Sequence, residues 1–162
     1  MRNAFAATAL LLASWSYEAK ADDLKTIVQG NTEIYCLAET IFRETRGTGV
    51  QEKILVGNVV YNRTKADGFA DTLCGVMKQK GQFPWINVFS QAERMKTIKR
   101  DKHEFDESYV IASYIISRSI DDPTNGALFF HARDGKSHSW TKGLRKVKTT
   151  KHHIYYKKKG TA

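Results

Sequence analysis

Two apolar helical patterns separated by a short glycine-containing turn constrain the fold of this chain more than any other feature. In residues 33–45 apolar side chains recur every three or four positions, and a second such pattern covers residues 50–62. Gly47 and Gly49 lie between the patterns, where glycine favours the end of a helix. Asn31 or Thr32 is the expected cap of the first helix. The second helix is so rich in valine that we expect it to be central and buried.

The rest of the sequence predicts shorter elements. Residues 64–88 indicate a long loop with one short helix at residues 73–78, and Ser90 is expected to cap a helix that ends near Lys99. A strongly periodic helix follows to about Ile120. After the DDPTNG turn, the aromatic runs ALFFH and HHIYY are typical of short strands that can pair. We therefore predict one α+β domain, mainly helical, with a small C-terminal β element.

The N-terminus has the three parts of a secretory signal. A positive start at Arg2 is followed by an apolar stretch over residues 4–15 and by Ala-Lys-Ala at residues 19–21. We expect residues 1–21 to direct export to the periplasm or the extracellular space, and residues 22–162 to form the functional domain. Two alternatives are a buried N-terminal helix and an uncleaved anchor that gives transient membrane contact.

Export affects how the two cysteines are interpreted. In an oxidising compartment Cys36 and Cys74 can form only one intramolecular bridge, which we predict in preference to free thiols. In the chain-entropy view, such a bridge stabilises a fold by about 3–4 kcal/mol.

The net charge of +9, from 26 Lys and Arg against 17 Asp and Glu, favours an anionic partner, although it can also serve solubility alone. The sequence contains no Gly-rich phosphate loop, no His-Glu-x-x-His zinc helix and no Gly-x-Ser-x-Gly turn. His152 and His153 are adjacent, which is typical of a surface pair rather than of metal ligands. We therefore predict no metal and no cofactor.

Glu44 is the residue with the strongest claim to chemistry, although on local pattern alone it is a solvated charge at a helix end. A carboxyl group at the end of an apolar helix can be desolvated, which raises its pKa and suits a general acid for glycosidic cleavage. Aromatic and amide side chains elsewhere suit sugar rings and N-acetyl groups. They are Gln82, Phe83, Trp85 and Trp140.

Five segments in order resemble the SleB-type cell wall hydrolases, the catalytic domain of spore cortex-lytic enzymes. The family has an apolar helix, a Glu-Ala-Arg-Gly-Glu motif and a second helix that ends in Asn-Arg. Here Glu44-Thr45-Arg46-Gly47 and Asn62-Arg63 match these motifs. The later segments supply Cys74, Gln82, Phe83 and Trp85, then Gly126, Ala127 and His131, then Trp140, and finally His152 and Tyr155.

The resemblance implies a lysozyme-like domain that cleaves the β-1,4 bond between N-acetylmuramic acid and N-acetylglucosamine in peptidoglycan. The second motif glutamate of the family is Thr48 here, so Glu44 is the single motif carboxylate. Further departures are Pro84 for serine, Thr150 for glycine and Ile154 for phenylalanine.

The loss of the second motif glutamate at Thr48 favours a lytic transglycosylase, in which Glu44 acts as acid and then as base to give a 1,6-anhydro product. We expect a monomer that acts on glycan strands, with Gln82, Phe83, Trp85 and His131 lining the groove. Core packing is the alternative role of Phe83 and Trp85, and a polar anchor at a helix end is that of Asn62-Arg63.

Three other functions stay open. One is a muramidase, including a phage endolysin, with a second carboxylate such as Glu52. Another is a secreted module that binds peptidoglycan without cutting it. The third, a nucleic-acid-binding protein, is disfavoured because the basic tail at residues 157–159 is short.

Overall fold

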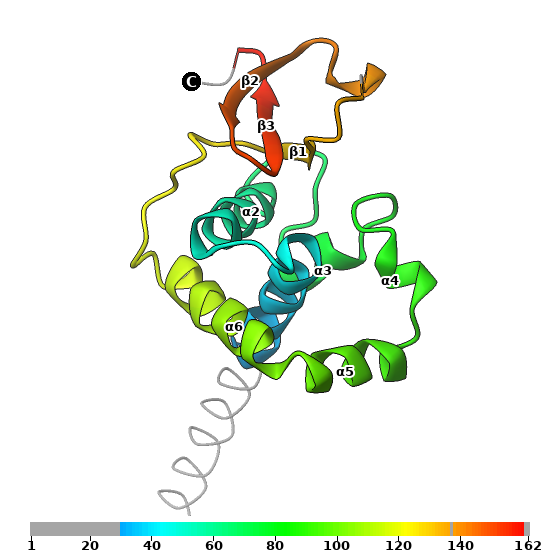
Figure 1. The fold of residues 1–162 in the computed structure, drawn as a ribbon. Coiled ribbons are helices and arrows are strands. Elements are labelled where there is room, and N and C mark those ends of the chain that lie inside the picture. The colour runs from blue at the N-terminus through cyan, green and yellow to red at the C-terminus, as the bar shows by residue number, and fades with distance from the viewer. Residues whose placement is uncertain (1–29, 137, 161–162) are drawn as a thin grey trace, which may run out of the picture. The chain divides into compact units, whose positions relative to one another are not determined.

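The computed structural model describes residues 30–136 and 138–160 (Figure 1). Residues 33–162 form one compact unit, to which the following description applies. The predicted signal at residues 1–21 lies outside the described residues. Within the described part of the chain, no helix has the length and apolar character needed to cross a membrane.

The two long apolar patterns form helices as the sequence predicts. The first covers residues 30–45 and is called the Glu44 helix below; the second, α2, is Val50–Arg63. Because residues 30–32 are already helical, the expected cap at Asn31 or Thr32 is wrong. Both residue types are tolerated inside a helix at a cost well below that of glycine or proline. In the turn between the helices, Gly47 has a φ of 77°, a left-handed conformation that favours glycine.

The helices α2 and α6 (Lys102–Ile116) cross closely at Gly57. A Cβ atom at position 57 would lie 2.5 Å from Ile115 Cδ1 and 2.8 Å from Ile41 Cδ1. No larger side chain fits there without displacing Ile115 of α6 and Ile41 of the Glu44 helix. The buried core at this crossing includes Leu37, Ala38, Phe42, Val60, Ile111 and Ala112.

Three shorter helices connect α2 to α6. They are α3 (Leu73–Lys78), α4 (Trp85–Val88) and α5 (Gln91–Arg100). α3 has the predicted bounds, and Ser90 caps α5 in a capping box with Glu93, as expected. The expected end of α6 at Ile120 is wrong. The helix stops at Ile116 because the chain turns into a left-handed conformation at Arg118, where φ is 57°.

The predicted disulfide is present between Cys36 of the Glu44 helix and Cys74 of α3. Beside it, the Glu33 carboxylate accepts hydrogen bonds from the backbone N–H groups of Leu73 at 2.6 Å and Cys74 at 3.3 Å. These contacts attach the start of α3 to the Glu44 helix.

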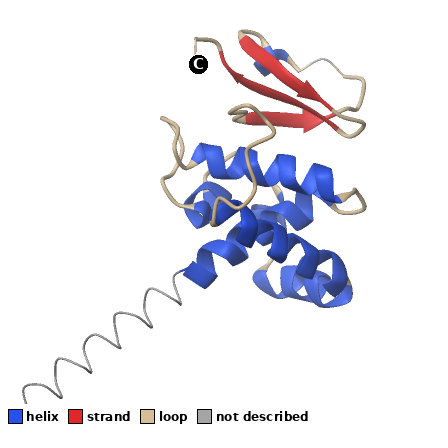
Figure 2. Cartoon of the chain, turned by 90° about the vertical axis from the view of Figure 1, so that its left-hand side faces the viewer, coloured by secondary structure: helices blue, strands red, loops and turns tan. Residues whose placement is uncertain are grey.

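The C-terminal part forms a three-stranded antiparallel sheet in the order β1 (Phe129–Ala132), β3 (His153–Lys158), β2 (Leu144–Thr149). The two aromatic runs therefore pair as strands, whereas no local pattern predicted β2. Figures 1 and 2 show the sheet on one side of α2 and the other helices on the opposite side. Tyr155 of β3 packs against Leu55, Val56 and Val59 of α2, so α2 is the central helix that the sequence predicts.

Candidate active site

Glu44 lies near the end of its helix with its carboxyl group half-buried. The indole N–H of Trp85 donates a hydrogen bond of 2.8 Å to Glu44 Oε1. Trp85 is the first residue of α4, and it follows Phe83, a core residue that is only 2% exposed. The Phe83 and Trp85 rings are in contact, with centres 6.1 Å apart. The buried Phe83 thus holds the segment that presents the indole to Glu44.

The surroundings of Glu44 favour its protonated form. Burial raises the pKa of the carboxyl group, whereas the hydrogen bond from Trp85 and the positive charge of Arg63 lower it by less. A raised pKa lets the group hold a proton at a higher pH than a surface glutamate does. This is the property that a general acid needs.

Arg63, the last residue of α2, places a buried cation close to Glu44. Its side chain is enclosed by three aromatic rings, and its Nε–H donates to the carbonyl oxygen of Leu128 at 2.8 Å. The Nη1 atom is buried with no hydrogen-bond partner among the described residues. Burial lowers the pKa of Arg63 to about 10, against the opposing effect of Glu44, so the guanidinium stays charged at neutral pH.

Asn62 has the anchoring role that was the structural alternative for the Asn-Arg pair. Its side-chain amide donates to Asp122 Oδ2 at 2.8 Å and lies 3.3 Å from Thr124 Oγ1 and from the Ala127 carbonyl oxygen. The amide therefore holds the turn before β1 against the end of α2.

Two cavities adjoin the immediate neighbours of Glu44. The first, called the arginine cavity, has a volume of about 460 Å³ and the second, called the Trp140 cavity, about 370 Å³. Trp85 lines the arginine cavity, and Arg63 and Pro84 line the Trp140 cavity. The other lining residues are Phe42, Arg43, Arg46, Phe89, Thr97 and Arg100 for the first, and Gly81, Gln82, Phe129, Phe130 and Trp140 for the second.

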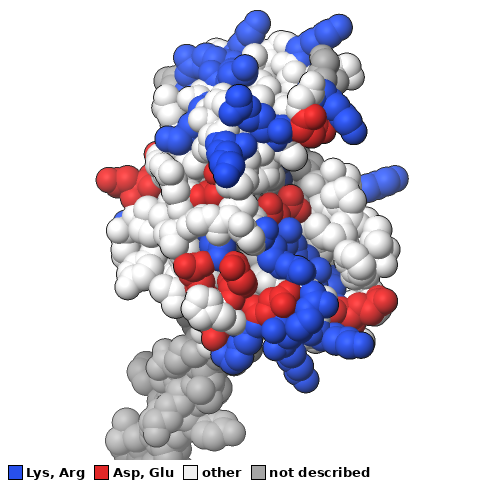
Figure 3. Space-filling model, viewed as in Figure 1, with Lys and Arg blue, Asp and Glu red and all other residues white. Residues whose placement is uncertain are grey.

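The arginine cavity has an excess of positive charge. Arg43 and Arg94 share the carboxylate of Glu39, each at 3.1 Å. Arg46 and Arg100 share the carboxylate of Asp101, at 3.3 and 3.1 Å. The four guanidinium groups therefore form ion pairs with only two carboxylates. The Arg43 guanidinium also lies 5.1 Å from the Trp85 ring centre. In Figure 3, Lys and Arg side chains gather over the strands and, mixed with acidic side chains, over the lower helices.

The structure places the predicted groove residues at different depths. Gln82 lines the Trp140 cavity and Trp85 the arginine cavity. Phe83 lies in the core, which agrees with the core-packing alternative. It therefore supports the groove from beneath. His131 of β1 contacts Trp140 edge-on, with ring centres 5.7 Å apart, and so lies behind the wall of the Trp140 cavity.

Glu52, the other candidate carboxylate, has a different environment. It is 4% exposed, and its Oε1 accepts from the Tyr155 hydroxyl at 2.5 Å and the Thr150 hydroxyl at 3.1 Å. His153 Nδ1 lies 2.7 Å from the same oxygen. Burial, followed by the hydrogen bond to Glu52, raises the pKa of Tyr155.

Glu52 therefore joins α2 to the sheet. It lines a separate small cavity of about 190 Å³, which shares no lining residue with the other two cavities. The expectation of a surface histidine pair is wrong for His153, which is 7% exposed because it packs on Glu52 and Phe130. A local sequence pattern does not reveal this network, since its members lie 98 to 103 positions from Glu52.

Comparison with known proteins places the chain in an enzyme class that acts on the bacterial cell wall. The sequence pattern of the cell wall hydrolase family matches residues 47–156, so this chain belongs to that family. The match begins three residues after Glu44 and includes Arg63, Trp85 and most of the sheet. Family membership supports the degradation of peptidoglycan.

Two solved structures share the fold. The catalytic domain of the Bacillus cereus SleB protein is 21% identical, with a TM-score of 0.57, over 77% of this chain and 89% of that one. The catalytic domain of the germination-specific lytic transglycosylase SleB from Bacillus anthracis is also 21% identical, with a TM-score of 0.57. That match covers 77% of this chain and 93% of the other. No curated protein matches the chain. The predicted family and the mainly helical α+β fold are thereby confirmed.

Proposed function

We propose that this protein is a lytic transglycosylase that cleaves the β-1,4 bond between N-acetylmuramic acid and N-acetylglucosamine, with Glu44 as its acid and base. The observation that carries the proposal is the Glu44 carboxyl group, whose pKa burial raises and which the Trp85 indole orients. Its neighbours Trp85 and Arg63 line two cavities, in a chain of the cell wall hydrolase family.

The reaction needs one carboxyl group in two protonation states. Glu44 first gives its proton to the glycosidic oxygen as the bond from that oxygen to C1 of the muramyl sugar breaks. The resulting carboxylate then takes the proton of the muramyl C6 hydroxyl, whose oxygen bonds to C1. The products are a free N-acetylglucosamine 4-hydroxyl and a 1,6-anhydro muramyl end, and Glu44 is protonated again.

The buried cation Arg63 supports the first step. Its charge favours the carboxylate that forms when Glu44 gives up its proton, because an opposite charge nearby stabilises the ionised form. The hydrogen bond from Trp85 acts in the same direction. Together they keep the pKa of Glu44 from rising so far that the proton is held too tightly for transfer.

The surroundings of Glu52 favour the transglycosylase over the muramidase. A hydrolase needs a second carboxylate that acts directly or through water at the sugar. Oε1 of Glu52 is instead engaged by Thr150, His153 and Tyr155, and Glu52 lines a different cavity. A mechanism with one carboxyl group has no need of it.

Peptidoglycan also fits the cavities. Gln82, Trp85 and Trp140 offer amide and aromatic surfaces for the sugars, with Phe83 and His131 behind them. The surplus of arginine beside Trp85 suits the carboxylates of the peptide stems. The same charge favours approach to an anionic wall.

Product analysis tests the proposal. Insoluble peptidoglycan is digested with the purified chain, and the soluble fragments are separated and weighed by mass spectrometry. We expect muramyl ends lighter by one water than hydrolysis products and resistant to borohydride. Reducing muramyl ends would establish a muramidase instead. Protein that sediments with the wall and releases no fragments would establish a binding module.

We further propose that the protein is exported and works as a monomer. The Cys36–Cys74 bridge is typical of an oxidising compartment. Mass spectrometry of the secreted protein is expected to show a mature chain that begins at Asp22. A chain that keeps Met1 would instead establish an uncleaved anchor or a protein that is not exported.

A further inference from the structure

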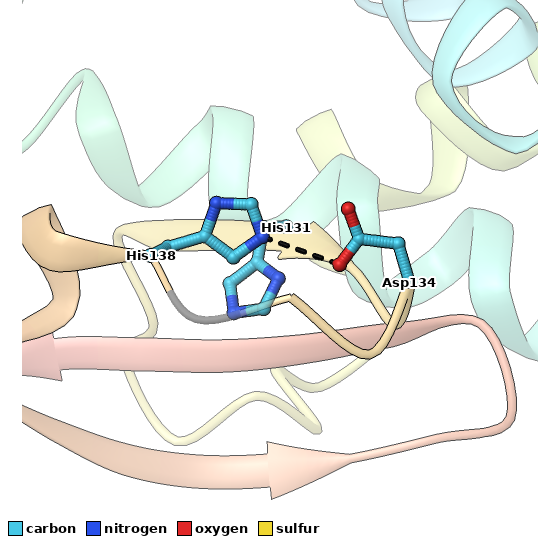
Figure 4. A group of neighbouring side chains, drawn as sticks. All are labelled: His131, Asp134 and His138. Atoms are coloured by element: carbon cyan, nitrogen blue, oxygen red, sulfur yellow. Dashed lines mark hydrogen bonds and ion pairs between the residues drawn. The ribbon is translucent and has the colours of Figure 1, made fainter.

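The loop after β1 brings two histidines and an aspartate together (Figure 4). His131 belongs to β1, Asp134 follows the end of that strand, and His138 precedes the short 3₁₀ helix Ser139–Thr141. One ligand atom from each residue lies within 4.8 Å of the other two. His138 Nε2 is 3.4 Å from Asp134 Oδ1, and the two imidazole rings have centres 4.1 Å apart.

These distances are close to those of a tetrahedral metal site. Zinc binds histidine nitrogen and carboxylate oxygen at about 2.0–2.2 Å, which puts neighbouring ligand atoms at about 3.3 Å. The separation of 3.4 Å between His138 and Asp134 already matches one edge of that tetrahedron. The remaining ligand atoms lie within 4.8 Å of one another, so they have to move closer together to reach that spacing around a bound ion.

His131 is oriented as a metal ligand would be. Its Nδ1 lies 2.7 Å from the carbonyl oxygen of Ala132, which can only accept, so Nδ1 carries the proton. The lone pair is then on Nε2, which lies 3.1 Å from the Tyr156 hydroxyl. Around bound metals, a histidine usually donates the N–H of one ring nitrogen to an acceptor such as a carbonyl oxygen and binds the metal through the other nitrogen.

Asp134 is also held in place. Its Oδ1 accepts a hydrogen bond of 3.0 Å from the backbone N–H of Lys136. Two imidazoles and one carboxylate are the ligand set of zinc and related transition ions rather than of calcium or magnesium. We propose that His131, Asp134 and His138 form a zinc-binding site, with water or the Tyr156 hydroxyl in the fourth position.

A metal here would order the wall of the Trp140 cavity. Trp140 contacts both His131 and Tyr156, with ring centres 5.7 and 6.1 Å away. Zinc would join the loop that carries His138 to β1, and thereby fix Trp140 at the cavity. The site is independent of the reaction proposed for Glu44 and assigns the metal no chemical step.

Zinc binding to the full mature chain without a histidine tag tests this proposal. After treatment with EDTA and its removal, zinc sulfate is titrated by calorimetry and Co²⁺ by absorption spectroscopy. We expect one zinc per chain with a Kd of about 10 µM or lower, a higher melting temperature with zinc, and the visible bands of tetrahedral cobalt. Trp140 fluorescence should change at the same stoichiometry.

Two variants and one control locate the site. His138→Ala should weaken zinc binding by more than about 100-fold, because loss of a supporting partner alone costs 10–100-fold. Asp134→Asn should weaken it by at least about 10-fold. Both residues lie in a surface loop, so circular dichroism should show an intact fold. His103→Ala removes an exposed histidine of α6 and should leave zinc binding unchanged.

Three results would overturn the site. The first is a wild-type chain that binds no zinc at about 1 mM, a Kd range too weak for a protein metal site. The second is a His138→Ala variant that binds zinc as the wild type does. The third is equal loss of zinc in His103→Ala. Activity on peptidoglycan is measured separately, so failure here does not affect the proposal for Glu44.

Discussion

Glu44 and Glu52 lie on either side of the same glycine turn, yet their carboxyl groups have contrasting hydrogen-bond partners. Glu44 receives one hydrogen bond, from an indole, and its neighbours line two sizeable cavities. Glu52 is 4% exposed, and one of its oxygens faces three polar groups on and beside β3. A carboxyl group with few fixed partners can exchange a proton, whereas one with many is a structural link. Burial alone does not show which of these two roles a carboxyl group has.

The largest expected effect is that of Glu44→Gln. The amide keeps the size of the side chain but cannot donate or accept the catalytic proton, so peptidoglycan cleavage should fall by about 10³-fold. The melting temperature should stay close to that of the wild type, because the amide oxygen can still accept from Trp85. Turbidity of wall suspensions and thermal unfolding measure the two quantities. Activity within threefold of the wild type would refute the catalytic role of Glu44.

Glu52→Gln should have the reverse pattern. The amide is a weaker acceptor and brings N–H donors towards a site already supplied by Tyr155 and His153. The free energy of unfolding should fall by about 2–3 kcal/mol, as measured in urea. Cleavage per folded molecule should be unchanged at a temperature where the variant is fully folded. A large loss of cleavage would instead make Glu52 the second carboxylate of a muramidase.

Trp85→Phe tests how the indole hydrogen bond affects the pKa of Glu44. The ring remains available to Arg43 and Phe83, but the N–H donor is lost. Because that bond favours the ionised form, its loss should raise the pKa of Glu44 further. We expect the basic limb of the pH profile to move upward and kcat/KM to fall about 10-fold.

Trp140→Phe is the matched control for that experiment. It alters an aromatic residue that lines the Trp140 cavity, whereas the indole that donates to Glu44 is that of Trp85. It should change KM and leave the pH profile in place. Equal pH shifts in both variants would show that the indole hydrogen bond does not tune the acid.

The smallest effect is on stability as a function of pH. Because the folded pKa of Glu44 is raised, the native state holds a proton that the unfolded chain has released. Stability should therefore fall as pH rises from the unfolded pKa, near 4.5, through the folded one. The Glu44→Gln variant should lack this decline, so the two unfolding curves should diverge over that interval. Parallel curves would contradict the raised pKa.

The sequence predicted those parts of the fold that local patterns specify. The apolar periods located the Glu44 helix and α2, α3 was predicted as a short helix within a long loop, and Ser90 located the start of α5. β2 was missed because half of the residues of Leu144–Thr149 are basic and the strand is partly exposed, without an alternating apolar face. α4 was missed because a single turn that begins after Pro84 has no room for a period.

The candidate site could be predicted only in part. Glu44 and Trp85 were named, but their hydrogen bond joins residues 41 positions apart, and no local pattern predicts it. Arg63 was named as part of the Asn-Arg motif, but its role as a buried cation was not predicted, because its enclosure by Phe69, Phe83 and Phe130 depends on tertiary packing. The histidines of the proposed zinc site were visible in the sequence, but only the turn after β1 brings them together.

The bond between Cys36 and Cys74 gives the disulfide a role beyond stability. Cys36 lies on the helix that carries Glu44, and Cys74 begins the stretch of chain that leads to Trp85. The covalent link thus limits how far the proton donor and its orienting indole can separate. We expect the reduced chain to hold the same residues more loosely. Synthesis in a reducing cell interior would then leave the enzyme weakly active, and oxidation after export would activate it where its substrate lies.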